Sequence, residues 1–527
     1  MATSKPSRKK LWTAIAGVIV IAVVAFAVYS MIPKPPEYQK TLVISLGTDI
    51  PIFDPQKATG MQNLGIIRLV CETLTDFDPD TGELKPCLAT SWEANAEATK
   101  WTIHLRKGVK FHDGTPFTAE AVKISVMDRL IDPAAKSPAR GSFTMIQSMN
   151  IVDDNTLVVN TTPYPPLMNL FNYAPSEIIS PTQWKKLGDD YYKQPIGTGP
   201  YKFVEHIKGT QVKLVANPEY WGTKPLVEEI VMKPIPEASA RVMALESGAS
   251  HIITNVPPAD YFRLKDNPKF YAMPALSQRS MHVSINTKRG PLKDVRVRQA
   301  LNYAVDKKTI IDRIFKGTAI MMDCPGIPPA SFGYTKIGVY EYNPAKAKEL
   351  LAAAGYANGF EIELAYGVGR FLMDTEVVEA IQSYLAAVGV KAKIAPSEWA
   401  AFRARESEPV DKCTVELAFV GFGLPNLDAD QALHDFHSEA WPPLGLEPTF
   451  YSNPKFDQLF DLGRSTTDVT KRKNAYREAT QILFDEAPWI FLFYEPQLHL
   501  ARSEVKNAKM RHDETIWLFG VYVEKKT

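Results

Sequence analysis

The sequence predicts a mixed α/β protein with two or three lobes. Its 527 residues exceed what one hydrophobic core holds, because single cores stop growing at about 250–300 residues. Strand-like and helix-like segments alternate along most of the chain, which is the pattern of mixed α/β folds. Forty prolines, against a usual share of about 5%, indicate many turns and few very long helices.

The strand candidates are short runs with alternating polarity or with many β-branched residues. The candidates cover residues 41–46, 101–105, 156–160, 281–286, 361–366, 390–394, 415–420 and 490–494.

The helix candidates carry start or stop signals. A Ser, Thr, Asp or Asn before an apolar repeat is typical of a helix start, and Gly or Pro marks the end. Helices are expected over 119–131 after Thr118, from Asp294 through Val305, from Asn343-Pro344 to Gly355, and from Thr470 to Pro488.

The N-terminus predicts export. Four basic residues precede the uncharged run Leu11–Ile32, whose 22 residues would span about 33 Å as a helix. The basic cluster is expected to stay in the cytoplasm, so the rest of the chain after the apolar run is expected outside the cytoplasm. The run is either a long secretory signal, with Ala25-Phe26-Ala27 as the cleavage site, or an uncleaved anchor. A Pro-rich spacer follows, so residues 1–40 form one unit.

The charge distribution argues against nucleic-acid binding. Residues 1–40 hold six of the 60 Lys and Arg and one of the 59 Asp and Glu, which leaves 54 basic and 58 acidic residues in the body. Nucleic-acid binding requires a basic face, and this body is slightly acidic.

Four cysteines occur without any C-x-x-C pair, so neither a zinc ribbon nor a thioredoxin-like site is indicated. Outside the cytoplasm thiols can pair, and Cys71 with Cys87 is the local candidate for a disulfide. The alternative is that all four, including Cys324 and Cys413, are buried small apolar side chains.

Signatures of catalysis are missing from the sequence. No G-x-S-x-G, phosphate-binding loop or H-E-x-x-H motif occurs, and no enzyme activity or cofactor is expected. Asp428, Asp430, His434 and His437 form the best metal-binding pattern, because the last three could share one helical face. A solvated helix start gives the same pattern and is favoured, so no metal site is predicted.

Several longer blocks resemble one family. Residues 71–79 read CETLTDFDP, 85–92 read KPCLATSW, and 101–117 read WTIHLRKGVKFHDGTPF. Further blocks are PIGTGPY at 195–201, NPEYWG at 217–222 and DVRVRQAL at 294–301. In this order they resemble the family 5 extracellular solute-binding proteins of ABC importers, which include dipeptide, oligopeptide and nickel binders. The resemblance covers about residues 41–500.

The resemblance implies a two-lobed periplasmic-binding-protein fold of the large type, with an extra subdomain in the first lobe. The lobes would close over a ligand by a hinge motion. The expected division is 41–80, 194–288 and 491–527 for the first lobe, 81–193 for its extra subdomain, and 289–490 for the second lobe.

By position in the family, three segments are expected to line the cleft between the lobes. The residues are Glu72, Thr73 and Leu74, Trp399 after Ser397 and Glu398, and Gly421, Phe422 and Gly423. Trp399 and Phe422 would supply flat apolar walls, and core packing is the alternative for both. The glycines would let backbone groups approach an extended ligand.

One departure bears on the ligand. Peptide binders of this family usually carry an acid just after that aromatic, which neutralises the peptide's α-amino group. Here that position falls near Leu424 or Pro425, and Asp428 is the nearest acid that could substitute. The case for a free peptide as the ligand is therefore weaker. The case for an oligosaccharide, a metal–chelator complex or another organic solute is correspondingly stronger.

The function implied is an exported receptor, periplasmic or on the cell surface, that delivers a peptide or similar small solute to an ABC permease. We expect it to act as a monomer and to have no nucleic-acid partner. A solute sensor without a permease and an extracellular hydrolase on the same scaffold are the alternatives. An enzyme would need a nucleophile and a base in the cleft.

Overall fold

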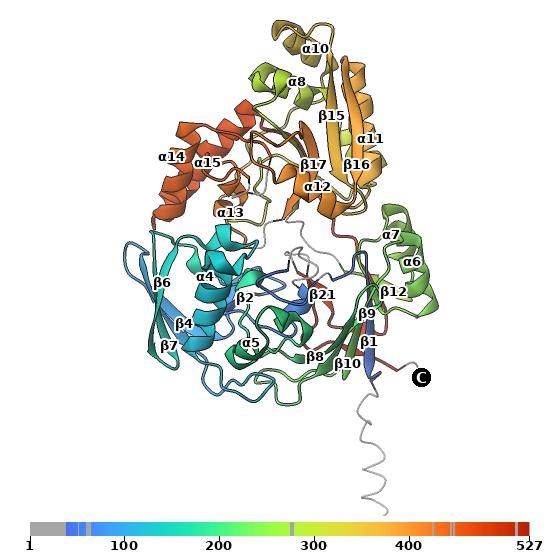
Figure 1. Cartoon of the computed structure of the whole chain (residues 1–527). Coiled ribbons are helices and arrows are strands. Elements are labelled where there is room, and N and C mark those ends of the chain that lie inside the picture. The colour runs from blue at the N-terminus through green and yellow to red at the C-terminus, as the bar shows by residue number, and fades with distance from the viewer. Residues whose placement is uncertain are drawn as a thin grey trace, which may run out of the picture.

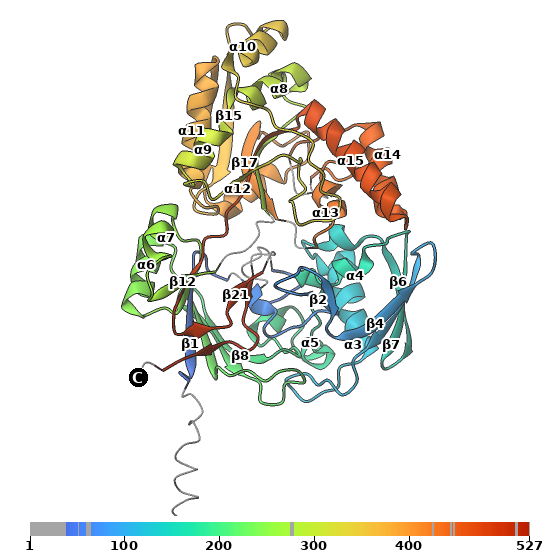
Figure 2. The same cartoon turned by 180° about the vertical axis from the view of Figure 1, so that it is seen from behind.

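The computed structural model describes residues 38–50, 52–58, 65–273, 279–423, 426–442, 445, 448–511 and 515–525. These residues form two lobes, stacked one above the other in Figures 1 and 2. The predicted N-terminal apolar helix lies outside the described residues. Within the described ranges, no helix has the length and apolarity needed to cross a bilayer.

The first lobe is built on a seven-stranded sheet in the order β12-β19-β11-β1-β10-β9-β8. Strand β1 (Thr41–Leu46) has the predicted bounds and runs parallel to β10 (Glu229–Pro234) and β11 (Ile252–Ile253). The other elements are β8 (Tyr201–Ile207), β9 (Gln211–Ala216), β12 (Phe270–Ala272), β19 (Leu500–Arg502), α5 (Pro181–Leu187), α6 (Ala238–Ser247) and α7 (Pro258–Leu264).

A four-stranded antiparallel sheet, β4-β5-β7-β6, has a hydrophobic core of its own. Its elements are β4 (Ala89–Ala94), β5 (Lys100–Leu105), β6 (Ile146–Asp153), β7 (Thr156–Thr161) and α4 (Leu167–Leu170). The helix expected over 119–131 is present in two parts, α3 (Ala119–Lys123) and the π-helix Ile124–Ile131. Thr118 precedes it, but its side chain makes no capping hydrogen bond, so that detail of the prediction is wrong.

The second lobe is built on a six-stranded sheet in the order β14-β18-β13-β17-β15-β16, in which β14 covers Ile320–Met321. The strands β15 (Phe360–Gly367), β16 (Val390–Ser397) and β17 (Leu417–Gly423) run parallel to one another. Strand β13 (Arg279–Ile285) is antiparallel to both β17 and β18 (Trp489–Tyr494).

Helices of the second lobe start where the sequence predicts. The side chains of Asp294 and Asn343 cap α8 (Val295–Ala304) and α10 (Pro344–Ala353). The helix α15 (Val469–Glu486) is capped by Asp468 and begins one residue before the predicted Thr470. The other helices are α9 (Lys307–Arg313), α11 (Asp374–Ala387), α12 (Trp399–Glu406), α13 (Ala429–His434) and α14 (Pro454–Ser465).

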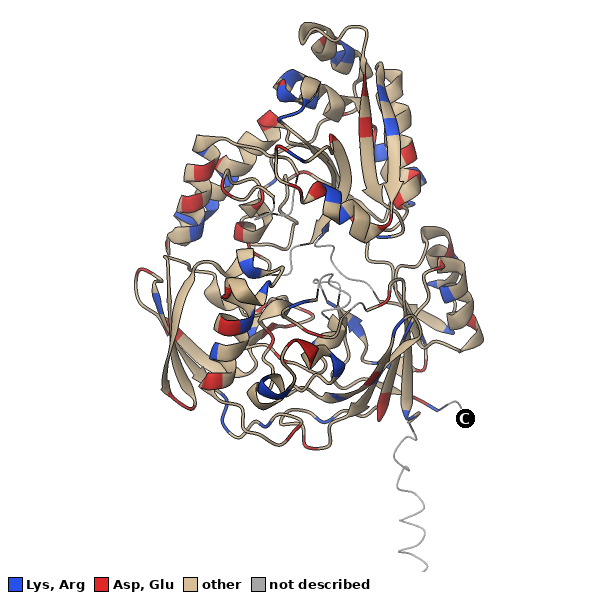
Figure 3. Cartoon of the chain, viewed as in Figure 1, with Lys and Arg blue, Asp and Glu red and all other residues tan. Residues whose placement is uncertain are grey.

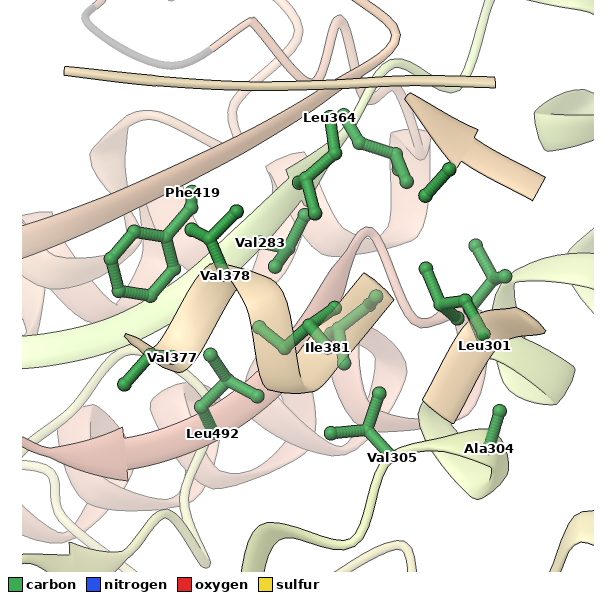
Figure 4. Close-up of a cluster of buried hydrophobic side chains, with 14 of the residues drawn as sticks. Val283, Leu301, Ala304, Val305, Leu364, Val377, Val378, Ile381, Phe419 and Leu492 are labelled. Atoms are coloured by element: carbon green, nitrogen blue, oxygen red, sulfur yellow. The ribbon is translucent and has the colours of Figure 1, made fainter. Parts of the chain in front are cut away.

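The apolar faces of these helices bury a large core against the sheet. Figure 4 shows Ile381 of α11 and Leu301 of α8 packed among side chains of the strands, such as Leu364 and Leu492. Each side chain of this size contributes about 1.5–3 kcal/mol when it is fully buried. The second lobe therefore provides a rigid frame for its sheet edges.

The chain crosses between the two sheets after β12 and again after β18. Arg279, which opens β13, pairs with Glu495, which follows β18, at 3.2 Å. This buried pair therefore joins the two crossing segments. The expected boundaries after residues 288 and 490 differ from this strand pairing, since β13 and all of β18 belong to the six-stranded sheet.

Candidate ligand site

Both lobes turn the carboxyl ends of parallel strands toward the other lobe. In the second lobe β15, β16 and β17 end at Gly367, Ser397 and Gly423. In the first lobe β1, β10 and β11 are parallel and end together. Figures 1 and 2 show α12, which follows β16, at the edge of its lobe that faces the first lobe. Ligands of open α/β sheets bind outside such carboxyl ends, so these facing edges form the candidate site.

Trp399 lies at this edge, directly after β16. Glu398 caps α12 by accepting backbone N–H bonds from Ala400 and Ala401 at 2.9 and 3.3 Å, which fixes the first turn. The indole is partly exposed and packs on Gly367, where a Cβ would lie only 2.6 Å from Trp399 Cε3. The strand end and the glycine together therefore hold an indole face at the edge.

Arginine and aromatic side chains gather around this indole. The guanidinium of Arg370 lies 5.5 Å from the Trp399 ring centre and 5.0 Å from that of Phe371. Phe371 meets Trp399 edge-on at 5.8 Å. Arg403 lies 5.8 Å from the centre of the indole and pairs with Glu406. A cation held on aromatic faces beside an open edge can bind an anion.

Arg370 was missed by sequence reasoning. A signal was present, because Gly367-Val-Gly-Arg-Phe371 places glycines and a basic residue directly after a predicted strand. Figure 3 shows that Lys and Arg are interspersed with Asp and Glu over both lobes, so charge alone did not mark this position.

The segment Gly421-Phe422-Gly423 closes β17 at the same edge. A Cβ on Gly421 would lie 2.5 Å from Met281 Sδ and 2.9 Å from Arg279 Cδ, so this glycine makes room for the neighbouring strand. Phe422 is half-buried against the aromatic cluster of the second lobe. Leu424 and Pro425, where the family's acid is expected, lie outside the described residues.

Asp428 is buried inside the second lobe. Both of its carboxylate oxygens accept from Nη2 of Arg472 at 3.0 Å, and it caps α13 through the backbone N–H of Asp430. Burial raises the pKa of this carboxyl, and the Arg472 charge opposes that rise. Its bonding is thus to its own lobe, which argues against the suggested substitution for the missing acid.

Glu72 is likewise bonded to its own lobe. Its carboxylate accepts hydrogen bonds from Thr198 Oγ1, Tyr220 Oη and Trp221 Nε1 at 2.7, 2.7 and 2.8 Å. Burial raises its pKa to about 7, against the lowering effect of these three donors. The neighbours are buried too, since Thr73 bonds the carbonyl of Thr75 and Leu74 packs in the subdomain core.

The cysteines do not form the suggested disulfide. All four are free thiols. Cys71 Sγ lies 3.7 Å from Tyr191 Oη, whereas Cys87 Sγ lies 4.0 Å from Glu72 Oε1. The two thiols thus have different partners, and burial raises the pKa of Cys71 well above its ordinary value. The pairing inferred from closeness in sequence is therefore wrong for this structure.

The residues of the possible metal-binding pattern do not point to a single ion position. Asp430 pairs with Arg464 at 3.1 Å, His434 lies beside Asp435, and His437 lies 3.7 Å from Asp461. In the described part of the chain, no three His, Cys, Asp or Glu side chains could hold one ion. The helical spacing is present, but each side chain is directed to a separate partner.

A small apolar hollow lies in the first lobe at the carboxyl end of β1. Leu46 of β1, Met232 of β10 and Thr254 after β11 contribute to it. The Thr254 hydroxyl is buried and has no hydrogen-bond partner among the described residues. Its other lining residues are Ile44, Gly65, Ile66, Leu69, Thr515, Ile516 and Leu518.

Comparison with known proteins agrees with this geometry. Residues 83–442 match the bacterial extracellular solute-binding proteins, family 5. The glutathione-binding protein GsiB of Pectobacterium atrosepticum is 32% identical over 88% of this chain and 91% of its own length.

Solved structures of similar proteins hold different solutes. The periplasmic binding protein DppA of Helicobacter pylori, in complex with the peptide STSA, is 28% identical with a TM-score of 0.84, over 93% of this chain and 99% of that one. NikZ of Campylobacter jejuni, in complex with Ni(L-His), is 26% identical with a TM-score of 0.79, over 90% and 97%.

Proposed function

Because this chain belongs to the bacterial extracellular solute-binding proteins of family 5, we propose that it is the extracytoplasmic receptor of an ABC importer. It captures a peptide or similar small organic solute between its lobes, delivers it to the permease and leaves it chemically unchanged. The observation that carries this proposal is the pair of facing carboxyl edges with the partly exposed Trp399 on one of them.

The chemistry of the described edge favours a solute with a carboxylate and an apolar or planar group. Arg370 places a positive charge beside the indole, which favours a carboxylate nearby, and Trp399 offers an apolar face. Glu72 and Asp428 bond to partners within their own lobes, so neither supplies a counter-charge for a ligand amine. The relatives named for glutathione and for the peptide STSA bind solutes that carry a carboxylate.

A metal–chelator complex is the second candidate. The likeness to NikZ, solved with Ni(L-His), favours it, because such a chelate also presents a carboxylate and a planar ring. An oligosaccharide, a sensor without a permease and a hydrolase have less support from the described edge.

Export accounts for the N-terminal sequence. Leu11–Ile32 directs the body out of the cytoplasm and serves as a cleaved signal or as a membrane tether. The body works there as a monomer. N-terminal sequencing of the mature protein distinguishes the signal from the tether.

A panel of defined solutes tests the proposal. The melting temperature of the purified protein is measured with reduced glutathione, a dipeptide, a tetrapeptide, nickel with histidine, or an oligosaccharide. Each mixture is then analysed by mass spectrometry to identify the solute after incubation. We expect at least one solute to raise the melting temperature, since a ligand of the native state stabilises it, and to be recovered unchanged. A solute that is cleaved during incubation would show a hydrolase instead.

A further inference from the structure

Hydrogen bonds join the two lobes at the side opposite the chain crossings, and the shortest of those described involves Tyr164. The phenol of Tyr164, between β7 and α4 of the subdomain, donates to Asp430 Oδ2 in the first turn of α13 at 2.5 Å. Tyr164 is 1% exposed and Asp430 is 4% exposed. Figures 1 and 2 both show α13 beside α4, so the two lobes meet here.

Two weaker contacts surround this bond. Asn169 of α4 donates from Nδ2 to the backbone carbonyl of Asn426 at 3.2 Å. A methyl of Leu427 comes within 3.7 Å of the position that a Cβ on Gly82 would occupy. The segment of the second lobe that makes these contacts follows β17 and so continues from the candidate ligand site.

The bond between Tyr164 and Asp430 can break without leaving a buried charge unpaired. Asp430 Oδ1 pairs with Nε of Arg464, which belongs to the same lobe, at 3.1 Å. If the lobes separate, the carboxylate keeps this cation and the neutral phenol passes into water. A hydrogen bond to a charged group is strong, but separating these two partners carries little desolvation cost.

We propose that Tyr164 and Asp430 form a latch that holds the lobes closed and so sets the closed fraction of the receptor. The proposal rests on the proposed receptor function and deepens it, since a ligand that binds the closed form gains affinity from every contact that favours closure. Asn169 is the second, weaker part of the same latch. The pair of Arg279 and Glu495 at the crossings stays formed in both states.

Small-angle X-ray scattering of the ligand-free protein tests the latch. The account predicts a measurable closed fraction in the wild type and a roughly ten- to hundredfold lower ratio of closed to open molecules in Tyr164→Phe, which corresponds to about 1.4–2.8 kcal/mol. Tyr334→Phe is the matched control, because Tyr334 bonds Asp323 inside the second lobe at 3.0 Å. It should leave the scattering unchanged.

A wild type that is already as open as Tyr164→Phe overturns the latch, and so does an equal shift in Tyr334→Phe. Circular dichroism confirms that each variant is folded. If Tyr164→Phe fails to fold, Asn169→Ala takes its place, with a smaller opening expected in the same direction. No solute is added, so failure of the latch is separate from failure of the receptor proposal.

Discussion

The two acids expected near the ligand and the arginine that was not expected differ in their surroundings. Glu72 and Asp428 are buried, and their oxygens accept hydrogen bonds from side chains of their own lobes. Arg370 and Trp399 are partly exposed at the edge between the lobes and rest on each other. The comparison indicates that this chain uses its buried acids to fix the lobes, whereas Arg370 and Trp399 lie at the edge where we propose that a solute binds.

The largest effect should come from the buried acid of the second lobe. In Asp428→Asn, Arg472 loses its ion-pair partner, and breaking such a buried pair costs about 3–5 kcal/mol. The midpoint of urea unfolding should fall steeply. Asp312→Asn, which removes an exposed pair with Lys308, is the control and should cost at most about 1 kcal/mol. Equal midpoints for the two variants would show that Asp428 is not an internal anchor.

Glu72 should make stability depend on pH. Its pKa is raised by burial to about 7, so the folded form takes up a proton more readily than the unfolded chain does. The contribution of Glu72 protonation to the free energy of unfolding is fully present below pH about 4.5 and is lost as the pH rises through about 7. At about 1.4 kcal/mol per pKa unit, the loss is about 3 kcal/mol.

The difference between the wild type and Glu72→Gln separates the pH-dependent contribution of Glu72 from the contributions of other titratable groups. The free energy of unfolding, measured from pH 4 to 8, should fall with rising pH more steeply in the wild type. Parallel profiles would mean that Glu72 is ionised throughout that range.

Trp399 should act mainly on binding. Trp399→Ala removes the indole face from the edge, and we expect the dissociation constant of the bound solute to rise roughly ten- to hundredfold, about 1.4–2.8 kcal/mol. Because the indole is partly exposed, unfolding should become easier by less than the 3–5 kcal/mol of a core aromatic. Trp92→Ala, in the subdomain sheet, should leave affinity unchanged. Phe422 packs against an aromatic cluster of the second lobe, and Phe422→Ala should lose less affinity than Trp399→Ala.

The smallest effect should come from Arg370→Lys. The charge is kept but the planar pair of donors is lost, so affinity for a carboxylate should fall about tenfold, or about 1.4 kcal/mol. Arg403 flanks the same indole but pairs with Glu406, and Arg403→Lys should change affinity little. Isothermal titration calorimetry measures both. A larger loss in Arg403→Lys would place the anion site at Arg403 instead of Arg370.

Much of the fold could be predicted because its signals are local. The alternation of polar and apolar residues predicted the bounds of β1. Asp294 and Asn343 cap the helices that they were expected to cap. Contacts between distant segments were not predictable in the same way. The partners of Asp428 and Glu72 come from residues 44 to 149 positions away, and no local pattern reports whether an acid will be paired inside.

Native mass spectrometry of the freshly purified protein, in the wild type and in Trp399→Ala, tests the central claim most directly. The account predicts one small solute per chain in the wild type, released unchanged on denaturation, and a clearly lower occupancy in Trp399→Ala. Equal occupancy in both proteins would place the ligand away from this edge. A wild type that carries no solute and takes up none from the panel would contradict the proposed receptor function.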